Sequence, residues 1–268
     1  MRASLSFPFF LVAALAMGPE GGLAQVTAGR AAWLLVSVVG SYVVGDALFL
    51  ASAQFLGVPA ALAIASTYPL WSAFAGWAFL GQRVGVAGLL GVLLVVAGVV
   101  TVVRRPGVAG ESAGPGVGLR AASGHTVGVL LAGATSLFWA LNTFAIARGG
   151  ADLPVAGVNT FRMGFAVALI PLARLVLRGK ETALVVPAAE MRRSWPFFLL
   201  ESVGGTALFV VGLTHSPLAV AAALTSLAPV LSVPFAFLVS REQIRGRVLL
   251  GIVVVTAGIV LLVGFGRG

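Results

Sequence analysis

The sequence predicts an all-α integral membrane protein, a helical bundle of about nine transmembrane helices arranged as two inverted repeats. Three observations lead to this prediction. The 268-residue chain is 59% hydrophobic and only 9% charged, apolar runs of transmembrane length recur along it, and its second half resembles its first. Because so few charged residues cannot cover the surface of a water-soluble domain of this size, most of the outer surface is expected to face lipid.

Nine apolar runs are long enough to cross a hydrocarbon core of about 30 Å as helices. They lie at residues 3–17, 32–54, 58–80, 84–103, 126–148, 154–178, 194–214, 217–239 and 246–264. Helices are expected rather than the strands of a barrel, because the runs do not alternate polar and apolar residues. The first run follows Arg2 and also has the pattern of a secretory signal peptide, but the internal repeat favours a retained helix.

The internal repeat has an offset of 160 residues, which places Gly45 on Gly205. The five-residue stretches that begin at these glycines share four residues, and further pairs follow at the same offset. The further pairs are Ser66 with Ser226, Pro69 with Pro229, Gly91 with Gly251, and Gly98 with Gly258. Self-similarity at one fixed offset indicates an internal duplication.

The duplication predicts three parts: a first repeat at residues 1–103, a linker at 104–124 and a second repeat at 125–268. The second repeat has five helices and the first has four, because the helix at 126–148 has no counterpart. We therefore expect that a first helix was lost, or that this start codon lies downstream of the true one. Successive units of five helices enter the membrane with opposite orientation, which is the inverted-repeat architecture of many secondary transporters.

Several duplicated motifs carry a resemblance to a known family. They are residues 45–57, 63–69 and 79–83 in the first half and 222–229 and 241–243 in the second. In this order they resemble the EamA-type branch of the drug/metabolite transporter superfamily. The resemblance implies ten helices in two five-helix repeats, and export or exchange of small metabolites. Gln82 stands where the family usually has a glutamate, whereas Glu242 keeps an acid in the second copy.

Two prolines mark the expected binding site. Pro69 and Pro229 lie near the centres of the runs 58–80 and 217–239, and each lacks the N–H that a helix interior needs. Interrupted helices at corresponding places in two repeats are the best sequence indication of a transporter site near the bilayer midplane. The nearby hydroxyl-bearing candidates are Ser66, Tyr68, Thr225 and Ser226. The alternative is that both prolines only kink packed helices.

Ionisable and amide side chains inside the apolar runs are further candidates. Asp46 lies near the middle of its run, where an ionised carboxylate costs about 2.5–3.5 kcal/mol, so it is expected to face the interior or a cavity. It is a candidate for binding a proton or an amine, with a structural hydrogen bond as the alternative. Glu201 is either an interior acid or an interfacial one, and Arg162 either attracts an anion or reaches the interface. Asn142, Trp139 and Asn159 are additional lining candidates.

Other functional classes find little support in the composition. The chain has no cysteine, only two histidines and no nucleotide-binding loop, so no metal, cofactor or ATP-driven step is expected. The net charge of +9 lies in short connections, which is typical of loops at a membrane face and not of nucleic-acid binding. The paired glycines are expected to pack against another helix, or against a second copy of the chain in a homodimer.

The expected function is therefore secondary transport, the export or exchange of a small metabolite or drug-like solute by a multi-pass protein of the cell membrane. The expected partners are the solute and membrane lipid. A non-transporting assembly subunit is the alternative, and an integral membrane enzyme is a more distant one. Loop charge places the N-terminus inside and the C-terminus outside, whereas the resemblance implies a cytoplasmic C-terminus, so the orientation stays open.

Overall fold

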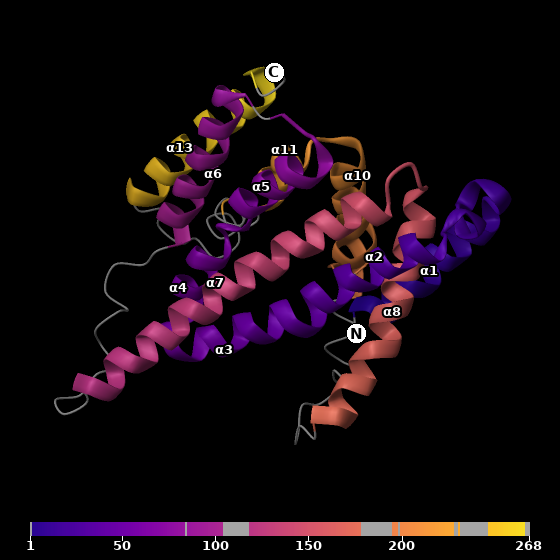
Figure 1. The fold of residues 1–268 in the computed structure, drawn as a ribbon, viewed down its shortest axis with the longest axis horizontal. Helices are drawn as coiled ribbons and strands as arrows, with labels where there is room; N and C mark the ends of the chain where they lie inside the picture. Colours follow the sequence, from indigo (N-terminus) through magenta and orange to yellow (C-terminus); the bar gives the residue numbers. More distant parts are fainter. Residues whose placement is uncertain are drawn as a thin grey trace. The chain divides into compact units, whose positions relative to one another are not determined.

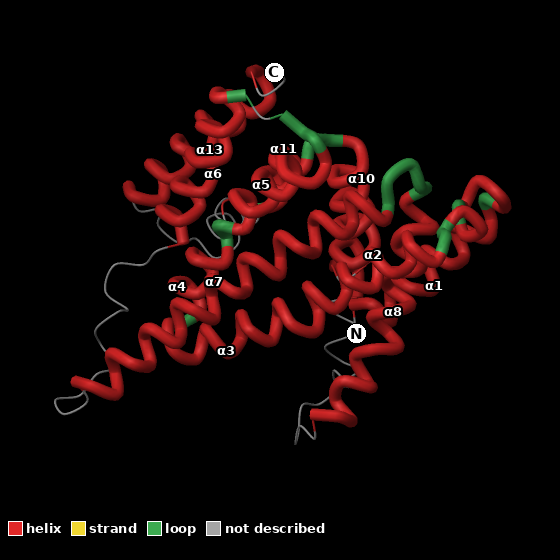
Figure 2. The backbone as a smooth tube through the Cα atoms, in the orientation of Figure 1, coloured by secondary structure: helices red, strands yellow, loops and turns green. Residues whose placement is uncertain are grey.

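Helices joined by short turns make up nearly all of the described chain. The computed structural model describes residues 2–83, 85–103, 118–177, 195–197, 199–227, 230 and 246–265. None of these residues forms a strand (Figure 2). The all-α prediction is therefore confirmed. The count of nine transmembrane helices stays a prediction, since residues 178–194 and 231–245, which include much of the run 217–239, lie outside the described residues.

The helices of the described residues lie mostly within the predicted apolar runs, and Figure 1 shows them in the colours of the sequence. The α-helices are α1 (Arg2–Ala16), α2 (Ala28–Val38), α3 (Asp46–Leu56), α4 (Val58–Ala65), α5 (Tyr68–Leu80), α6 (Val86–Val103), α7 (Gly118–Gly149), α8 (Val155–Leu177), α10 (Thr206–His215), α11 (Leu218–Thr225) and α13 (Gly246–Phe265). Two short 3₁₀ turns, η1 (Gly18–Gly21) and η2 (Leu23–Gln25), follow α1. Helix α7 already begins at Gly118, inside the predicted linker 104–124.

Several helices have the length and apolarity that crossing a membrane requires. Three continuous helical stretches meet both conditions, at Ala28–Leu56, Gly124–Gly149 and Trp195–His215. Shorter apolar helices are Ala3–Ala16, Val86–Thr101, Val155–Leu169 and Leu249–Leu262. Large apolar side chains such as Val86, Leu130 and Leu208 are more than half exposed, as expected of surfaces that face lipid.

Two π-helical segments occupy matching places in the two sequence halves. η3 (Val39–Gly45) joins α2 to α3 without interrupting the helix, and η4 (Leu200–Gly205) runs into α10 in the same way. The offset of the repeat places one segment on the other. Because π-helical segments are rare, their recurrence shows that the two halves share local structure beyond their apolar pattern. Such segments also occur frequently at functional sites.

The run predicted at 58–80 is two helices and not one kinked helix. α4 ends at Ala65 and α5 begins at Tyr68, with Pro69 in its first turn. Proline lacks an N–H and crowds the carbonyl four residues earlier, whereas at a helix start the missing donor costs nothing. Thr67 closes the break, because its hydroxyl donates to the Ile64 carbonyl at 2.7 Å. In the second half α11 ends at Thr225, which is the matching position to Ala65.

The chain divides into two compact units that interleave the sequence halves. Unit 1 comprises Met1–Val43 and Asn142–Ser216, and unit 2 comprises Val44–Leu141 and Pro217–Gly268. In unit 1, α1 packs along α8, and Ala3, Phe10, Met163 and Ala166 of these helices form an apolar cluster with Val38 of α2. In unit 2, α5 packs against α11, and α6 packs against α13. Each unit therefore contains helices from both predicted repeats.

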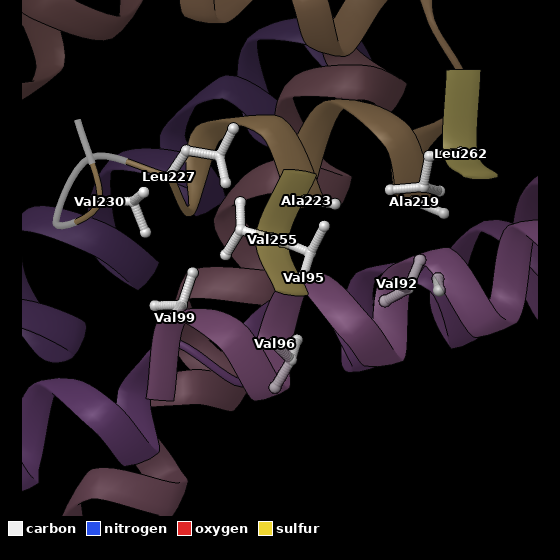
Figure 3. Packing of buried hydrophobic residues seen from close by; sticks show 11 residues of the cluster. Val92, Val95, Val96, Val99, Ala219, Ala223, Leu227, Val230, Val255 and Leu262 are labelled. Carbon is white, nitrogen blue, oxygen red and sulfur yellow. The ribbon is translucent and has the colours of Figure 1, made fainter. Parts of the chain in front are cut away.

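The paired glycines bring α6 and α13 into close contact. A Cβ atom on Gly91 would lie 2.8 Å from the Gly258 carbonyl oxygen, and one on Gly98 would lie 2.8 Å from the Gly251 carbonyl oxygen. Around this seam Val92, Val95, Val96, Val99 and Val255 are buried in one apolar cluster, and Figure 3 labels all five. The prediction that these glycines pack against another helix is thus confirmed, since each helix provides the partner of the other.

Candidate solute-binding site

Trp139 of α7 is the centre of a polar and aromatic cluster in unit 2. Its indole Nε1–H donates a hydrogen bond to Oδ1 of Asp46 at 3.3 Å. Its ring meets the ring of Tyr68 edge-on, with centroids 6.1 Å apart, and lies 5.7 Å from the ring of Phe49. The indole thus connects the first residue of α3 with the first residue of α5. We refer to Asp46, Tyr68, Trp139 and Thr225 as the Trp139 cluster.

The Tyr68 hydroxyl joins the two sequence halves. It lies 2.7 Å from Oγ1 of Thr225 and donates to the Ala222 carbonyl at 3.0 Å. Tyr68 is buried, and it stands directly after the break between α4 and α5, whereas Thr225 ends α11. Neutral hydrogen bonds therefore hold the end of α11, from the second half, against the start of α5, from the first half. Such bonds can be exchanged for hydrogen bonds to a polar solute at little cost in free energy.

Removing the Tyr68 hydroxyl tests this link. We expect Tyr68→Phe to lower the free energy of unfolding by about 1–2 kcal/mol, because the Ala222 carbonyl and the Thr225 hydroxyl lose a partner. A double-mutant cycle with Thr225→Val measures the coupling between the two side chains, which we expect to be about 0.5–1 kcal/mol. Thermal unfolding in detergent provides the readout. Strict additivity of the two changes would show that the hydroxyls do not interact.

The other predicted hydroxyls and prolines lie around the helix breaks. Ser66 and Ser226 are buried at the ends of α4 and α11, and the Ser226 hydroxyl donates to the Ala223 carbonyl at 2.7 Å. Pro69 is buried in the first turn of α5. Pro229 lies outside the described residues. Of the predicted site residues in unit 2, the structure therefore brings Asp46, Tyr68 and Thr225 into one chain of contacts.

Asn142 and Glu201 belong to unit 1. Glu201 is exposed on the π-helical segment η4, so it is not an interior acid of this unit. Asn142 is buried, and its Oδ1 accepts a hydrogen bond from Nη2 of Arg162 at 3.4 Å. Its partner is thus a cation of the same unit and not a member of the Trp139 cluster.

Arg162 is buried, with only 2% of its surface exposed. Its Nε donates to Oγ of Ser37 at 3.1 Å, and its Nη1 donates to Oδ1 of Asn159 at 3.4 Å. Together with the bond to Asn142, these contacts join α2, α7 and α8. The alternative that Arg162 reaches the interface is therefore wrong for this structure. We refer to Ser37, Asn142, Asn159 and Arg162 as the Arg162 cluster.

Two residues that form polar contacts between helices were not predicted as site residues from the sequence. Ser37 lies within an apolar run, and nothing in the sequence distinguishes it from a hydroxyl that bonds its own helix, as it also does with the Leu34 carbonyl. Gln82, which departs from the usual glutamate, accepts a hydrogen bond from the backbone N–H of Leu218 at 2.9 Å. Its side-chain oxygen thus satisfies a backbone N–H at the start of α11. A neutral amide can accept this hydrogen bond, so the role does not require the charge of a glutamate.

Metal-dependent chemistry finds no donor set in the described part of the chain. No group of three or more histidine, cysteine, aspartate or glutamate side chains lies close enough to hold a metal ion there. What the described residues do offer is hydroxyl, amide, carboxyl and guanidinium groups inside apolar helices. Polar groups are expensive in that setting and usually mark a path for ions or solutes. Such groups inside apolar helices are typical of membrane transport proteins.

Comparison with known proteins supports this class. The family model described as "EamA-like transporter family" matches residues 1–104 and 126–264. The chain therefore belongs to the EamA-like transporter family, and it is an integral membrane protein. This is a family of transporters and not of enzymes.

Structural comparison adds the fold. One solved structure, described only as "Crystal structure of protein", is 19% identical and has a TM-score of 0.75 over 100% of this chain and 87% of that chain. At this identity the likeness shows a shared fold alone. A search of the curated proteins found no match.

Proposed function

We propose that this protein is a secondary transporter that exports or exchanges a small metabolite or drug-like solute across the cell membrane as a multi-pass protein. The observation that carries the proposal is the Tyr68–Thr225 contact, which joins helix interruptions at matching places in the two sequence halves. In transporters built from repeats, solutes bind near the midplane where interrupted helices of both repeats meet. The predicted inverted repeats and midplane site are parts of this proposal.

Within the proposed site, each member of the Trp139 cluster has a role that follows from its chemistry. The indole and phenol rings provide flat apolar faces, and the hydroxyls of Tyr68 and Thr225 donate and accept hydrogen bonds. Asp46 is the only carboxylate in the cluster and is half-buried. We assign it the binding of a coupling proton or of the amine of a solute, with the indole N–H orienting the carboxylate.

Asp46→Asn tests the proposal. A screen of toxic metabolites and cationic drugs on an expressing host first identifies a solute whose tolerated concentration rises with the wild-type protein. In proteoliposomes we expect Asp46→Asn to lower the flux of that solute at least about tenfold, because an amide neither ionises nor takes up a proton. Proton release or uptake coupled to solute movement is measured in the same vesicles and should disappear.

Asp152→Asn is the matched control. Asp152 is exposed in the turn between α7 and α8 and has a φ of 59°, a left-handed conformation that asparagine adopts as readily as aspartate. We expect it to keep wild-type flux. A correctly inserted wild-type protein that moves no solute of the screen would favour the alternative, a membrane assembly subunit without a transport path.

A further inference from the structure

The Arg162 cluster holds a cation among neutral partners. Its guanidinium donates hydrogen bonds to a serine hydroxyl and to two asparagine carbonyl oxygens. None of these three acceptors is a carboxylate. A buried charge inside a membrane protein is costly, so an ionisable residue there is by default a candidate functional residue.

Two of the three hydrogen bonds of the guanidinium are long. Bonds from a charged nitrogen to an anionic oxygen are typically about 2.7–2.9 Å long, whereas those to Asn142 and Asn159 are both 3.4 Å. Each Nη atom carries two N–H groups, and one on each is used by an asparagine. A guanidinium presents its N–H groups in a planar fork that can bind the two oxygens of a carboxylate, which a pair of separate asparagine oxygens satisfies less well.

The cluster lies inside the helical layer and not at its edge. Arg162 and Asn142 are each seven residues from the nearer end of their helices, which is a depth of about 10 Å. At this end of α7 a Cβ on Gly149 would lie 2.9 Å from Cβ of Trp33 in α2.

Both π-helical segments border the cluster. η3 begins two residues after Ser37, and η4 ends directly before Thr206, whose carbonyl accepts a hydrogen bond from Nδ2 of Asn159 at 3.5 Å. The cluster is closed in this structure, since Arg162 and Asn159 are almost fully buried. π-helical segments interrupt the regular bonding of a helix without breaking it, so they are the places where its two ends can shift.

We propose that the Arg162 guanidinium binds the carboxylate of the transported solute through Nη1 and Nη2, and that the solutes of this protein are small organic acids or amino acids. Ser37, Asn142 and Asn159 position the fork and satisfy it while the site is empty. The proposal rests on the proposed transport function and names its substrate class. If Arg162 only held α2, α7 and α8 together, its guanidinium would not bind an added anion.

Matched acid and amide pairs test the proposal on the purified full-length protein. The probes are benzoate with benzamide, lactate with lactamide, and glutamate with glutamine, each at millimolar concentration in detergent. We expect at least one acid to raise Tm by about 2 °C or more while its amide does not, because only the acid binds the folded state through the fork. Absence of a difference in every pair would overturn the proposal.

Asn142→Asp separates ligand binding from a structural role. It places an internal carboxylate beside Nη2, which should preserve or raise Tm without ligand and abolish the acid-dependent rise. Arg162→Lys keeps the charge but loses the fork, and should weaken acid binding about tenfold. Gln25→Glu, which adds the same charge on the exposed turn η2, is the control and should keep the rise. An unchanged rise in Asn142→Asp would overturn the proposal.

Flux measurements distinguish this inference from the proposed function. Wild-type transport of a solute without a carboxylate, at a rate that Arg162→Gln leaves unchanged, would uphold transport and overturn the anion assignment. Conversely, acid-dependent stabilisation of a wild-type protein that moves none of these acids would uphold the binding site and overturn transport. Transport of an acid that Asn142→Asp abolishes would uphold both.

Discussion

Gly98→Leu is expected to cause the largest loss of stability, about 3 kcal/mol, by separating α6 from α13. A Cβ on Gly98 would lie 2.8 Å from the Gly251 carbonyl oxygen and 2.8 Å from the Val255 backbone nitrogen. Because these are backbone atoms, no side-chain rotation relieves the clash, and the helices must move apart. Tm of the detergent-purified protein should fall by about 6 °C or more.

Gly133→Ala is the control for this prediction. Gly133 lies within α7, and a Cβ there meets nothing within 4 Å. Since alanine is the better helix former, this change should be neutral or stabilise by about 0.5–1 kcal/mol. Equal Tm values for Gly98→Leu and the wild type would show that the two helices are not packed through their glycines.

Trp139→Ala is expected to have the second largest effect, on both stability and transport. The indole contacts Tyr68 and Phe49 and donates to Asp46, so its removal leaves a cavity and a carboxylate with one donor fewer. We expect a loss of about 2–3 kcal/mol, below the range for a fully buried tryptophan because Trp139 is half-buried. Solute flux per inserted protein should fall at least about tenfold.

Two further tryptophan variants locate the cause. Trp77 is 62% exposed, so Trp77→Ala should change Tm by less than about 2 °C and leave flux unaltered. Trp139→Phe keeps an aromatic ring beside Tyr68 but cannot donate to Asp46. If it retains most of the stability and loses flux, the indole N–H acts on Asp46. Wild-type flux in Trp139→Ala would remove this cluster from the transport path.

Proline and glycine positions could be interpreted from the sequence because their effects are local. Gly91 and Gly98 lie two turns apart on one helix face, and the structure confirms that this face packs against a helix. Pro69 was expected to disturb its helix, and it does, although as a full break between Ala65 and Tyr68 and not as a kink. Neither effect requires knowledge of a distant residue, since a missing Cβ or N–H acts wherever the chain goes.

Partners across the fold could not be predicted in the same way. Asp46 and Asn142 were both predicted as site residues. In the structure Asp46 accepts a hydrogen bond from Trp139, whereas Asn142 accepts one from Arg162 in the other unit. Ser37 had no signal in the sequence, because a lone serine in an apolar run usually bonds its own helix. Its contact with Arg162 spans 125 residues of chain.

The sequence by itself determined that this chain forms apolar helices in a membrane and that its halves are related, because hydropathy and repetition are properties of single segments and their order. Only the tertiary structure decided which polar groups meet: a tyrosine and a threonine from opposite halves, and an arginine enclosed by neutral oxygens. Hydrogen bonds act over about 3 Å, so they depend on how helices pack, which one-dimensional spacing does not contain.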